Sequence, residues 1–164
     1  MNPNTPRIAL AALALSAAGF VGIVLNEGYT DRAVIPVPGD VPTVGFGTTE
    51  GVKLGDKITP PQAVARALRD VTKFEGALKQ CIRVELFQHE YDVYVDHAYN
   101  IGARRFCEST MAAKINARDY AGACAEFPRW FKGPGGVDCR DKTNDCYGVI
   151  LRRERQRALC EGRS

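Results

Sequence analysis

The chain has 164 residues, which is enough for one domain or for one domain with two lobes. Its composition is that of a globular protein rather than a disordered one, with a formal net charge of +3 and no long run of one sign. A mildly basic protein of this kind suits an anionic polymer as its partner.

Residues 8–25 form an uncharged run, IALAALALSAAGFVGIVL, and the acid Glu27 follows two residues later. As a helix the run would be roughly 27 Å long, just under the roughly 30 Å hydrocarbon core of a bilayer. Half of its residues are Ala, Gly or Ser, and the larger apolar ones favour insertion by only roughly 3 to 5 kcal/mol together. Such a segment can enter a membrane and later leave it, and a carboxylate attached to it would move with it.

Three other interpretations of this run stay open. A cleaved secretory signal peptide is the main one, because small residues at 12–14 and 16–18 suit a signal peptidase, although Arg7 is the only charged side chain before the run. A permanent membrane anchor is the second, and the weak apolarity disfavours it. A buried core helix of a cytosolic protein is the third, and the cysteines disfavour it.

The six cysteines, an even number with none in the apolar run, favour a set of disulfides: Cys81, Cys107, Cys124, Cys139, Cys146 and Cys160. The compartment is then oxidising, most simply a bacterial periplasm. No CxxC pair occurs, and the two histidines are far from most cysteines in the sequence, so we expect neither a metal nor another cofactor.

One pairing follows from the sequence itself. Cys139 and Cys146 flank a polar stretch that a disulfide would close into a loop. For the other four cysteines the preferred pairs are Cys81 with Cys160 and Cys107 with Cys124, although spacing alone does not choose among the possibilities.

Residues 29–51 are expected to form short strands and turns. Prolines and small residues punctuate β-prone pieces between positions 36 and 42, and residues 43–47 alternate apolar with small side chains, as a hairpin strand does.

The first long helix is predicted to begin at Thr59. This residue suits the N-cap, Pro60 suits the first helical position, and Gln62 completes a capping box. Apolar residues then recur at three- and four-residue spacing to about residue 80. Further helices are predicted over 87–101, 108–117, 119–129 and 147–160. A small β-element followed by helices indicates an α+β fold.

Basic residues gather in the last predicted helix, at Arg152, Arg153, Arg155 and Arg157. No aromatic residues alternate with them, and no nucleic-acid-binding motif is present. We therefore favour a solvated helix face and expect no nucleic-acid partner.

Three polar residues have the chemistry of a hydrolytic site. Glu27 follows the apolar run, and a carboxyl group against apolar surface stays protonated near neutral pH, as a general acid must. Asp40, in a turn rich in Pro and Gly, should stay ionised and can bind a water, while Thr43 offers a hydroxyl group. An acid opposite a carboxylate and a hydroxyl fits cleavage of a glycosidic bond. The alternative is that Asp40 is only a turn residue and Thr43 only a strand residue.

These residues resemble a known family. Glu27-Gly28, followed by Thr43-Val44-Gly45-Phe46-Gly47-Thr48, is similar to the catalytic region of the phage-type lysozymes, the endolysins. The resemblance continues in order through residues 98–102, 109–110, 129–130 and 148–153 and so covers nearly the whole chain. It implies a two-lobed α+β muramidase, with a small β-hairpin lobe and a larger helical lobe joined by a long helix. Such an enzyme cleaves the β-1,4 bond between N-acetylmuramic acid and N-acetylglucosamine in peptidoglycan and lyses the bacterial host.

The resemblance implies a catalytic Glu, Asp and Thr. It assigns Glu27 as the acid and Thr43 as the third member. Pro36 stands where the family carries its aspartate, so we assign Asp40 as the middle member, with Asp31 the other acid of the loop.

The resemblance also suggests residues that bind the substrate or support the acid. Asn100 resembles a cleft residue that reaches the substrate, although it could equally cap a helix ahead of Gly102. Arg152 is expected to bind in the cleft, and either it or Arg153 to pair with Glu27. Tyr99 and Trp130 could line the cleft, although aromatic residues of this kind more often pack in a core. His97 lies on the helix predicted over 87–101, and we expect a structural rather than a catalytic role for it.

The apolar run resembles the signal-anchor-release segments of some endolysins. This implies that residues 1–25 first tether an inactive enzyme in the host inner membrane through residues 8–25. The catalytic domain, residues 26–164, would become active in the periplasm after release. Because the run carries no cysteine, activation would proceed by refolding rather than by disulfide exchange.

We expect a monomer that acts on peptidoglycan. A non-catalytic wall-binding or membrane-anchored structural protein is the rival, and loss of Glu27 would have favoured it. A protein that itself perforates membranes is disfavoured by the long cysteine-bearing body.

Overall fold

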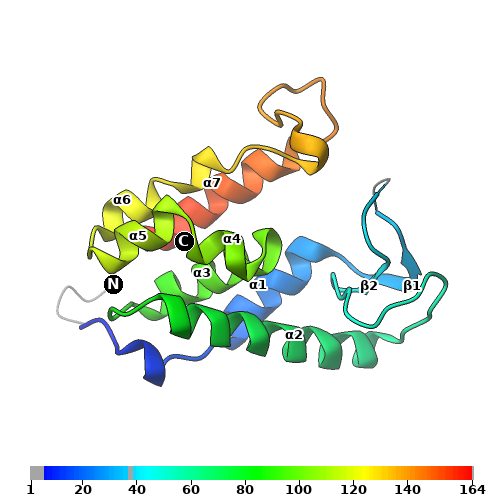
Figure 1. Cartoon of the computed structure of the whole chain (residues 1–164), viewed down its shortest axis with the longest axis horizontal. Helices are drawn as coiled ribbons and strands as arrows, with labels where there is room; N and C mark the ends of the chain where they lie inside the picture. Colours follow the sequence, from blue (N-terminus) through cyan, green and yellow to red (C-terminus); the bar gives the residue numbers. More distant parts are fainter. Residues whose placement is uncertain (1–5, 37–38, 164) are drawn as a thin grey trace.

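The computed structural model describes residues 6–36 and 39–163. Two short strands lie at one end of the molecule and a group of helices at the other, and one long helix runs between them (Figure 1). The helices and strands are, in chain order, α1 (Ala17–Glu27), β1 (Thr30–Val34), β2 (Thr43–Gly45), α2 (Pro60–Cys81), α3 (Gln88–Ile101), α4 (Ala103–Cys107), α5 (Thr110–Asn116), α6 (Tyr120–Cys124) and α7 (Gly148–Cys160). The predicted two-lobed α+β fold is confirmed.

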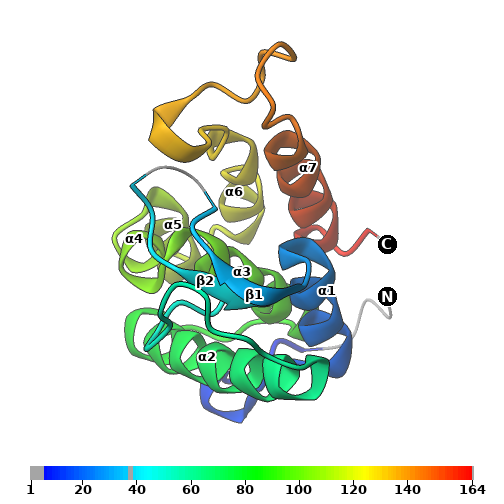
Figure 2. The same ribbon diagram turned by 90° about the vertical axis from the view of Figure 1, so that its right-hand side faces the viewer.

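The small lobe is an antiparallel hairpin that packs on α2 (Figure 2). Thr30 lies opposite Gly45 and Val34 opposite Thr43, with an irregularity between these two pairs. The buried residues of this lobe form a core of their own: Ala33, Val44, Phe46, Ile58, Ala63 and Ala67.

Helix α2 joins the two lobes. It begins at Pro60, and the side chain of Gln62 accepts a hydrogen bond of 3.0 Å from the backbone N–H of Thr59, so the predicted capping is confirmed. Its first turns contribute to the core of the small lobe, whereas Val71 and Leu78 belong to the core of the large lobe.

The large lobe is built around α3, which packs against α1, α2, α4 and α7. Its core also includes three residues of the apolar N-terminal run, namely Leu10, Leu13 and Ile23. Helix α1 ends at Glu27 because Gly28 follows with a φ of 69°, a left-handed conformation that glycine adopts without strain.

The apolar run is not one continuous helix in this structure. Leu10–Ala12 form a 3-10 turn, and α1 begins only at Ala17, with Ser16 as its N-cap. Asp92 of α3 accepts hydrogen bonds from the backbone N–H and the hydroxyl of Ser16, at 2.9 and 2.5 Å. The part of the run before Ala17 is therefore not α-helical, and its last residue is held by hydrogen bonds to α3 of the large lobe. No helix among residues 6–36 and 39–163 is long and apolar enough to cross a bilayer.

The structure contains three disulfides, one of which was predicted correctly. Cys139 pairs with Cys146, as expected. The expected pairs Cys81 with Cys160 and Cys107 with Cys124 are wrong, because Cys81 pairs with Cys107 and Cys124 with Cys160. The reason is the packing: α2 lies against α4, so the ends of these two helices meet. The last residues of α6 and α7, Cys124 and Cys160, lie 5.6 Å apart between Cα atoms.

Two details of the helical prediction are wrong as well. The short helix α4 was not expected, and the helix predicted over 119–129 is split into α6 and a 3-10 turn, Phe127–Arg129. Pro128 within that turn has no N–H to donate to a continuing α-helix.

Candidate active site

Glu27 is the last residue of α1, and its side chain is 19% exposed. Its Oε1 accepts a hydrogen bond of 2.9 Å from Nη1 of Arg152 on α7. The expected apolar surroundings are therefore not what the structure shows, because the carboxyl group lies in an ion pair.

The hairpin brings Asp40 and Thr43 to the same cleft as Glu27. This cleft has a volume of about 400 Å³. The hydroxyl of Thr43 donates to the carbonyl of Val41 at 3.1 Å, and Oδ1 of Asp40 accepts from the N–H of Val41 at 2.8 Å. Asp40 is exposed, so water reaches its carboxylate. The three residues assigned to catalysis thus line one cleft, and Pro36 lines it too.

Two aromatic rings form part of the cleft wall. Tyr99 of α3 and Phe74 of α2 lie 5.1 Å apart between ring centroids. The hydroxyl of Tyr99 donates to the carbonyl of Phe46 at 2.7 Å, which fixes the hairpin to α3. Burial, followed by the charges of Asp70 and Glu27, raises the pKa of Tyr99, so its hydroxyl stays protonated at neutral pH.

A charged group lies on the α2 side of the cleft. Lys73 forms ion pairs with Glu50 and Asp70. Asp70 also accepts a 2.7 Å hydrogen bond from the buried hydroxyl of Thr48, which ties the hairpin to α2. The sequence did not single out Phe74, Lys73, Glu50 or Asp70 as cleft residues.

Asn100 lines the cleft, but it does not cap α3 through a hydrogen bond, since its Oδ1 accepts from Nη2 of Arg153 at 2.6 Å. Arg153 is buried and does not contact Glu27, so Arg152 is the arginine of the pair that does. The prediction that the arginines of α7 form a solvated face is wrong for Arg152 and Arg153, which point into the protein. It holds for Arg155 and Arg157, which are exposed.

His97 and Trp130 do not line this cleft. His97 is fully buried, with its ring centroid 5.1 Å from that of Trp130, and its Nδ1 accepts from Nη1 of Arg153 at 3.3 Å. Burial, followed by the positive charge of Arg153, lowers the pKa of His97 well below its usual value. His97 is thus a neutral core residue.

The arrangement has the parts that hydrolysis of a glycosidic bond requires. A carboxyl group from α1 lines the same cleft as a carboxylate and a hydroxyl from the hairpin, with aromatic surface nearby on which a sugar ring can lie. Among the residues the structure describes, no group of His, Cys, Asp and Glu could hold a metal ion.

Comparison with known proteins gives consistent matches. A family model described as phage lysozyme matches residues 25–156. An endolysin of Acyrthosiphon pisum secondary endosymbiont phage 1 is 37% identical over 119 residues, which are 73% of this chain and 79% of that protein. A SAR-endolysin of Pseudomonas phage phiKMV is 35% identical over 117 residues, 71% of each chain. The solved endolysin from Escherichia coli O157:H7 phage FAHEc1 has a TM-score of 0.76 at 30% identity, covering 91% of this chain and 94% of that one.

Proposed function

Because the chain belongs to the phage lysozyme family, we propose that Glu27, Asp40 and Thr43 together cleave the β-1,4 bond between N-acetylmuramic acid and N-acetylglucosamine. The enzyme is a lysozyme, and lysis of the bacterial host is its general role. The observation that carries the assignment of these residues is that all three line one cleft although they come from different elements.

In this proposal Glu27 gives its proton to the glycosidic oxygen of the leaving sugar. Asp40 accepts a proton from a water on the opposite side of the bond, and the hydroxyl of Thr43 orients that water. Asn100 donates to the substrate through its amide nitrogen, because its Oδ1 is held by Arg153. Arg152 acts on Glu27 through their ion pair, and its own contact with the substrate stays a prediction.

The test is the variant Glu27→Gln, in which an amide replaces the group that must release a proton. We expect the purified, folded variant to retain less than about 1% of the wild-type rate, in line with general-acid contributions of roughly 10² to 10⁴. The measurement is turbidity loss of chloroform-treated Gram-negative cells. Glu154→Gln, at an exposed position of α7, is the matched control and should keep full activity. A rate above a few percent would show that Glu27 is not the acid.

We propose further that residues 1–25 are a signal-anchor-release segment and that residues 26–164 are the catalytic domain. The chain would first be held in the host inner membrane through residues 8–25, inactive, and then be released to the periplasm as an active monomer. Support comes from the uncharged apolar sequence of the run and from the three disulfides, which suit an oxidising compartment.

The packing of the run favours a retained segment over a cleaved signal peptide. Leu10 and Leu13 belong to the core of the large lobe, and cleavage after residues 14 or 18 would remove both. The same packing supports the proposal that activity would depend on release. In a membrane-spanning helix, Glu27 would stand at the bilayer surface, whereas in this structure α1 places it against Arg152.

A further inference from the structure

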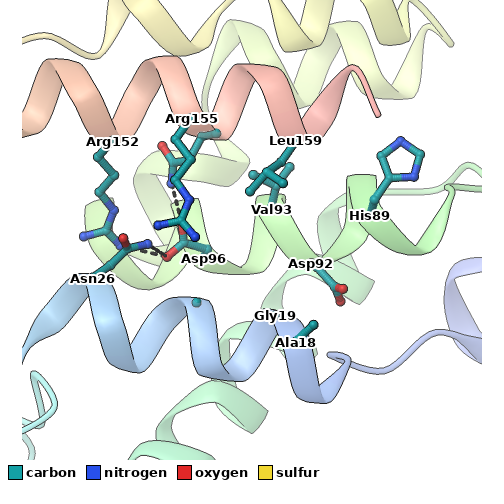
Figure 3. Close-up of a pocket in the computed structure, with 12 residues that line it drawn as sticks. Ala18, Gly19, Asn26, His89, Asp92, Val93, Asp96, Arg152, Arg155 and Leu159 are labelled. Carbon is teal, nitrogen blue, oxygen red and sulfur yellow. Dashed lines mark hydrogen bonds and ion pairs between the residues drawn. The ribbon is translucent and has the colours of Figure 1, made fainter. Parts of the chain in front are cut away.

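A buried carboxylate, Asp96, lies at the junction of α1, α3 and α7 and is only 7% exposed. It accepts three hydrogen bonds, each from a different side chain. Figure 3 shows Asp96 on α3 with Asn26 of α1 and Arg152 of α7 beside it. Nη2 of Arg152 and Nδ2 of Asn26 donate to Oδ1 at 2.8 and 3.2 Å, and Nε2 of Gln156 donates to Oδ2 at 2.5 Å. None of the residues assigned to catalysis contacts it directly, and it does not line the catalytic cleft.

Arg152 is shared between Asp96 and the catalytic acid. One terminal nitrogen binds Glu27 at 2.9 Å and the other binds Asp96 at 2.8 Å. The remaining nitrogen, Nε, is buried and has no hydrogen-bond partner among the described residues. Because a guanidinium group is planar and rigid, the bond to Asp96 fixes the direction in which Nη1 meets Glu27.

A chain of hydrogen bonds connects the second oxygen of Asp96, through Gln156 and Arg153, to Asn100 in the cleft. Oε1 of Gln156 accepts from Nη1 of Arg153 at 2.7 Å, and Nη2 of Arg153 donates to Asn100 at 2.6 Å. Both ends of this chain of hydrogen bonds, Glu27 and Asn100, line the catalytic cleft. Asp96 is therefore the point from which both residues are held.

Charged groups surround Glu27 on several elements. Arg152 of α7 forms an ion pair with it, and burial lowers the pKa of the next residue, Arg153, to about 10. From the other elements, the charged and phenolic groups around Glu27 and Arg152 are Asp96 and Tyr99 of α3, Asp70 and Lys73 of α2, Asp40 of the hairpin, and Glu50 in the loop after it. Of these carboxylates, only Asp96 binds Arg152 directly among the described residues.

We propose that Asp96 is a positioning residue for the catalytic acid. It holds Arg152 against Glu27, and its negative charge partly offsets the positive charge of that arginine. Without Asp96, the positive charge of Arg152 would act on Glu27 without a second carboxylate to offset it, and a nearby positive charge favours the ionised form of a carboxyl group. The proposal rests on the assignment of Glu27 as the acid.

The test is the pH dependence of kcat/KM for Asp96→Asn on isolated peptidoglycan at constant ionic strength. Activity should be lost on the alkaline side about one pH unit lower than in the wild type, a typical effect of one neighbouring charge. At pH 7 the rate should fall by up to about tenfold, and at lower pH it should return toward the wild-type rate. Asp96→Ser, which leaves room for a water beside Arg152, should shift the profile in the same direction.

Asp92→Asn is the matched control. Asp92 lies one turn earlier on α3 and also binds α1, through Ser16, but it does not touch Arg152. Its profile should keep the wild-type position.

An unshifted profile for either folded Asp96 variant would overturn the proposal, whether its rate is reduced uniformly or not at all. Failure of both Asp96 variants to fold while Asp92→Asn folds would also overturn it, because Asp96 would then be structural only. Full activity of Glu27→Gln would instead refute the proposed function.

Discussion

Gly47 of the hairpin lies directly against the carboxyl group of Glu27. A Cβ atom built on Gly47 would stand 3.3 Å from Oε2 of Glu27 and 3.5 Å from the ring of Tyr99. The φ of Gly47 is 85°, so the position requires glycine for its backbone and for the space beside the acid.

We therefore predict that Gly47→Ala reduces lysis at least about tenfold by displacing Glu27, since small misplacements of a reacting group are costly. Gly51→Ala is the control, because Gly51 also has a positive φ of 69° but nothing lies within 4 Å of its Cβ position. Both variants should lose roughly 1 to 2 kcal/mol of stability from backbone strain, measured by denaturant unfolding. Equal activity losses in the two variants would contradict the contact with Glu27.

For Asp40→Asn we predict a rate loss of at least roughly a hundredfold, the usual size of a general-base contribution. The side-chain oxygen of asparagine can still accept from the N–H of Val41, so the turn should be retained. Asp31→Asn, on the exposed part of β1, is the matched control and should be nearly silent. If the Asp40 variant were silent instead, the role would pass to Asp31 or to a water held by Thr43 alone.

Replacing Gly22 by Leu tests the membrane segment. A Cβ atom built at this position meets nothing within 4 Å in the folded protein, and leucine favours insertion by roughly 0.3 to 0.6 kcal/mol. More chain should remain in the membrane fraction before depolarisation, and lysis should be delayed. Gly19 is less suitable, because its Cβ would lie 2.9 Å from the carboxyl carbon of Asp92 and would disturb the released form.

The control for this experiment is Gly76→Leu on α2, a position outside the apolar run where a Cβ atom also meets nothing within 4 Å. It should leave fractionation unchanged. Fractions are compared by immunoblotting and N-terminal sequencing. A mature chain that starts near Ala17 or Gly19 would contradict the retained segment.

His97 should make the folded state sensitive to acid. Its pKa is lowered in the folded protein, so below about pH 6.5 the unfolded chain binds a proton that the folded chain does not. Stability should therefore fall as the pH drops through that value, by at most about 1.4 kcal/mol per pH unit from this residue. His97→Gln, which keeps an acceptor for Arg153, should lose less stability between pH 7.5 and pH 5. Parallel losses by denaturant unfolding would refute this role.

The three disulfides should differ in their contribution to stability. In the chain-entropy model, a bridge across 36 residues stabilises by about 4 kcal/mol and one across 7 by about 2.5 kcal/mol. Replacing Cys124 and Cys160 by Ser should thus cost more than replacing Cys139 and Cys146. Non-reducing peptide mapping checks the pairing, and free energies of unfolding check the order. A bridge between Cys81 and Cys160 would contradict the structure.

Local sequence was sufficient to predict the elements whose causes are local. Thr59, Pro60 and Gln62 predicted the start of α2, and the hairpin followed from the small residues around positions 43–47. The break in the apolar run was not predictable in this way, because the groups that bind its backbone there are distant in sequence: Ser16 binds Asp92, 76 positions away.

The same limit applies to the site. Glu27, Thr43 and Asn100 were identified from motifs, and each lines the cleft. The support from Asp96 was missed, because a single acid in a helix gives no pattern until α7 is packed against it. The sign that could have indicated it was Asp96 itself, an acid that directly follows the apolar residues 93–95 and is buried with them.

The positions of the disulfides have one more consequence. All of them lie between residues 81 and 160, and the first 80 residues contain no cysteine. The helical lobe can therefore complete its oxidation while the N-terminal run is elsewhere, and the later docking of that run requires no thiol chemistry. Adding a reductant should neither start nor prevent docking. It should only make the lobe that receives the run less stable.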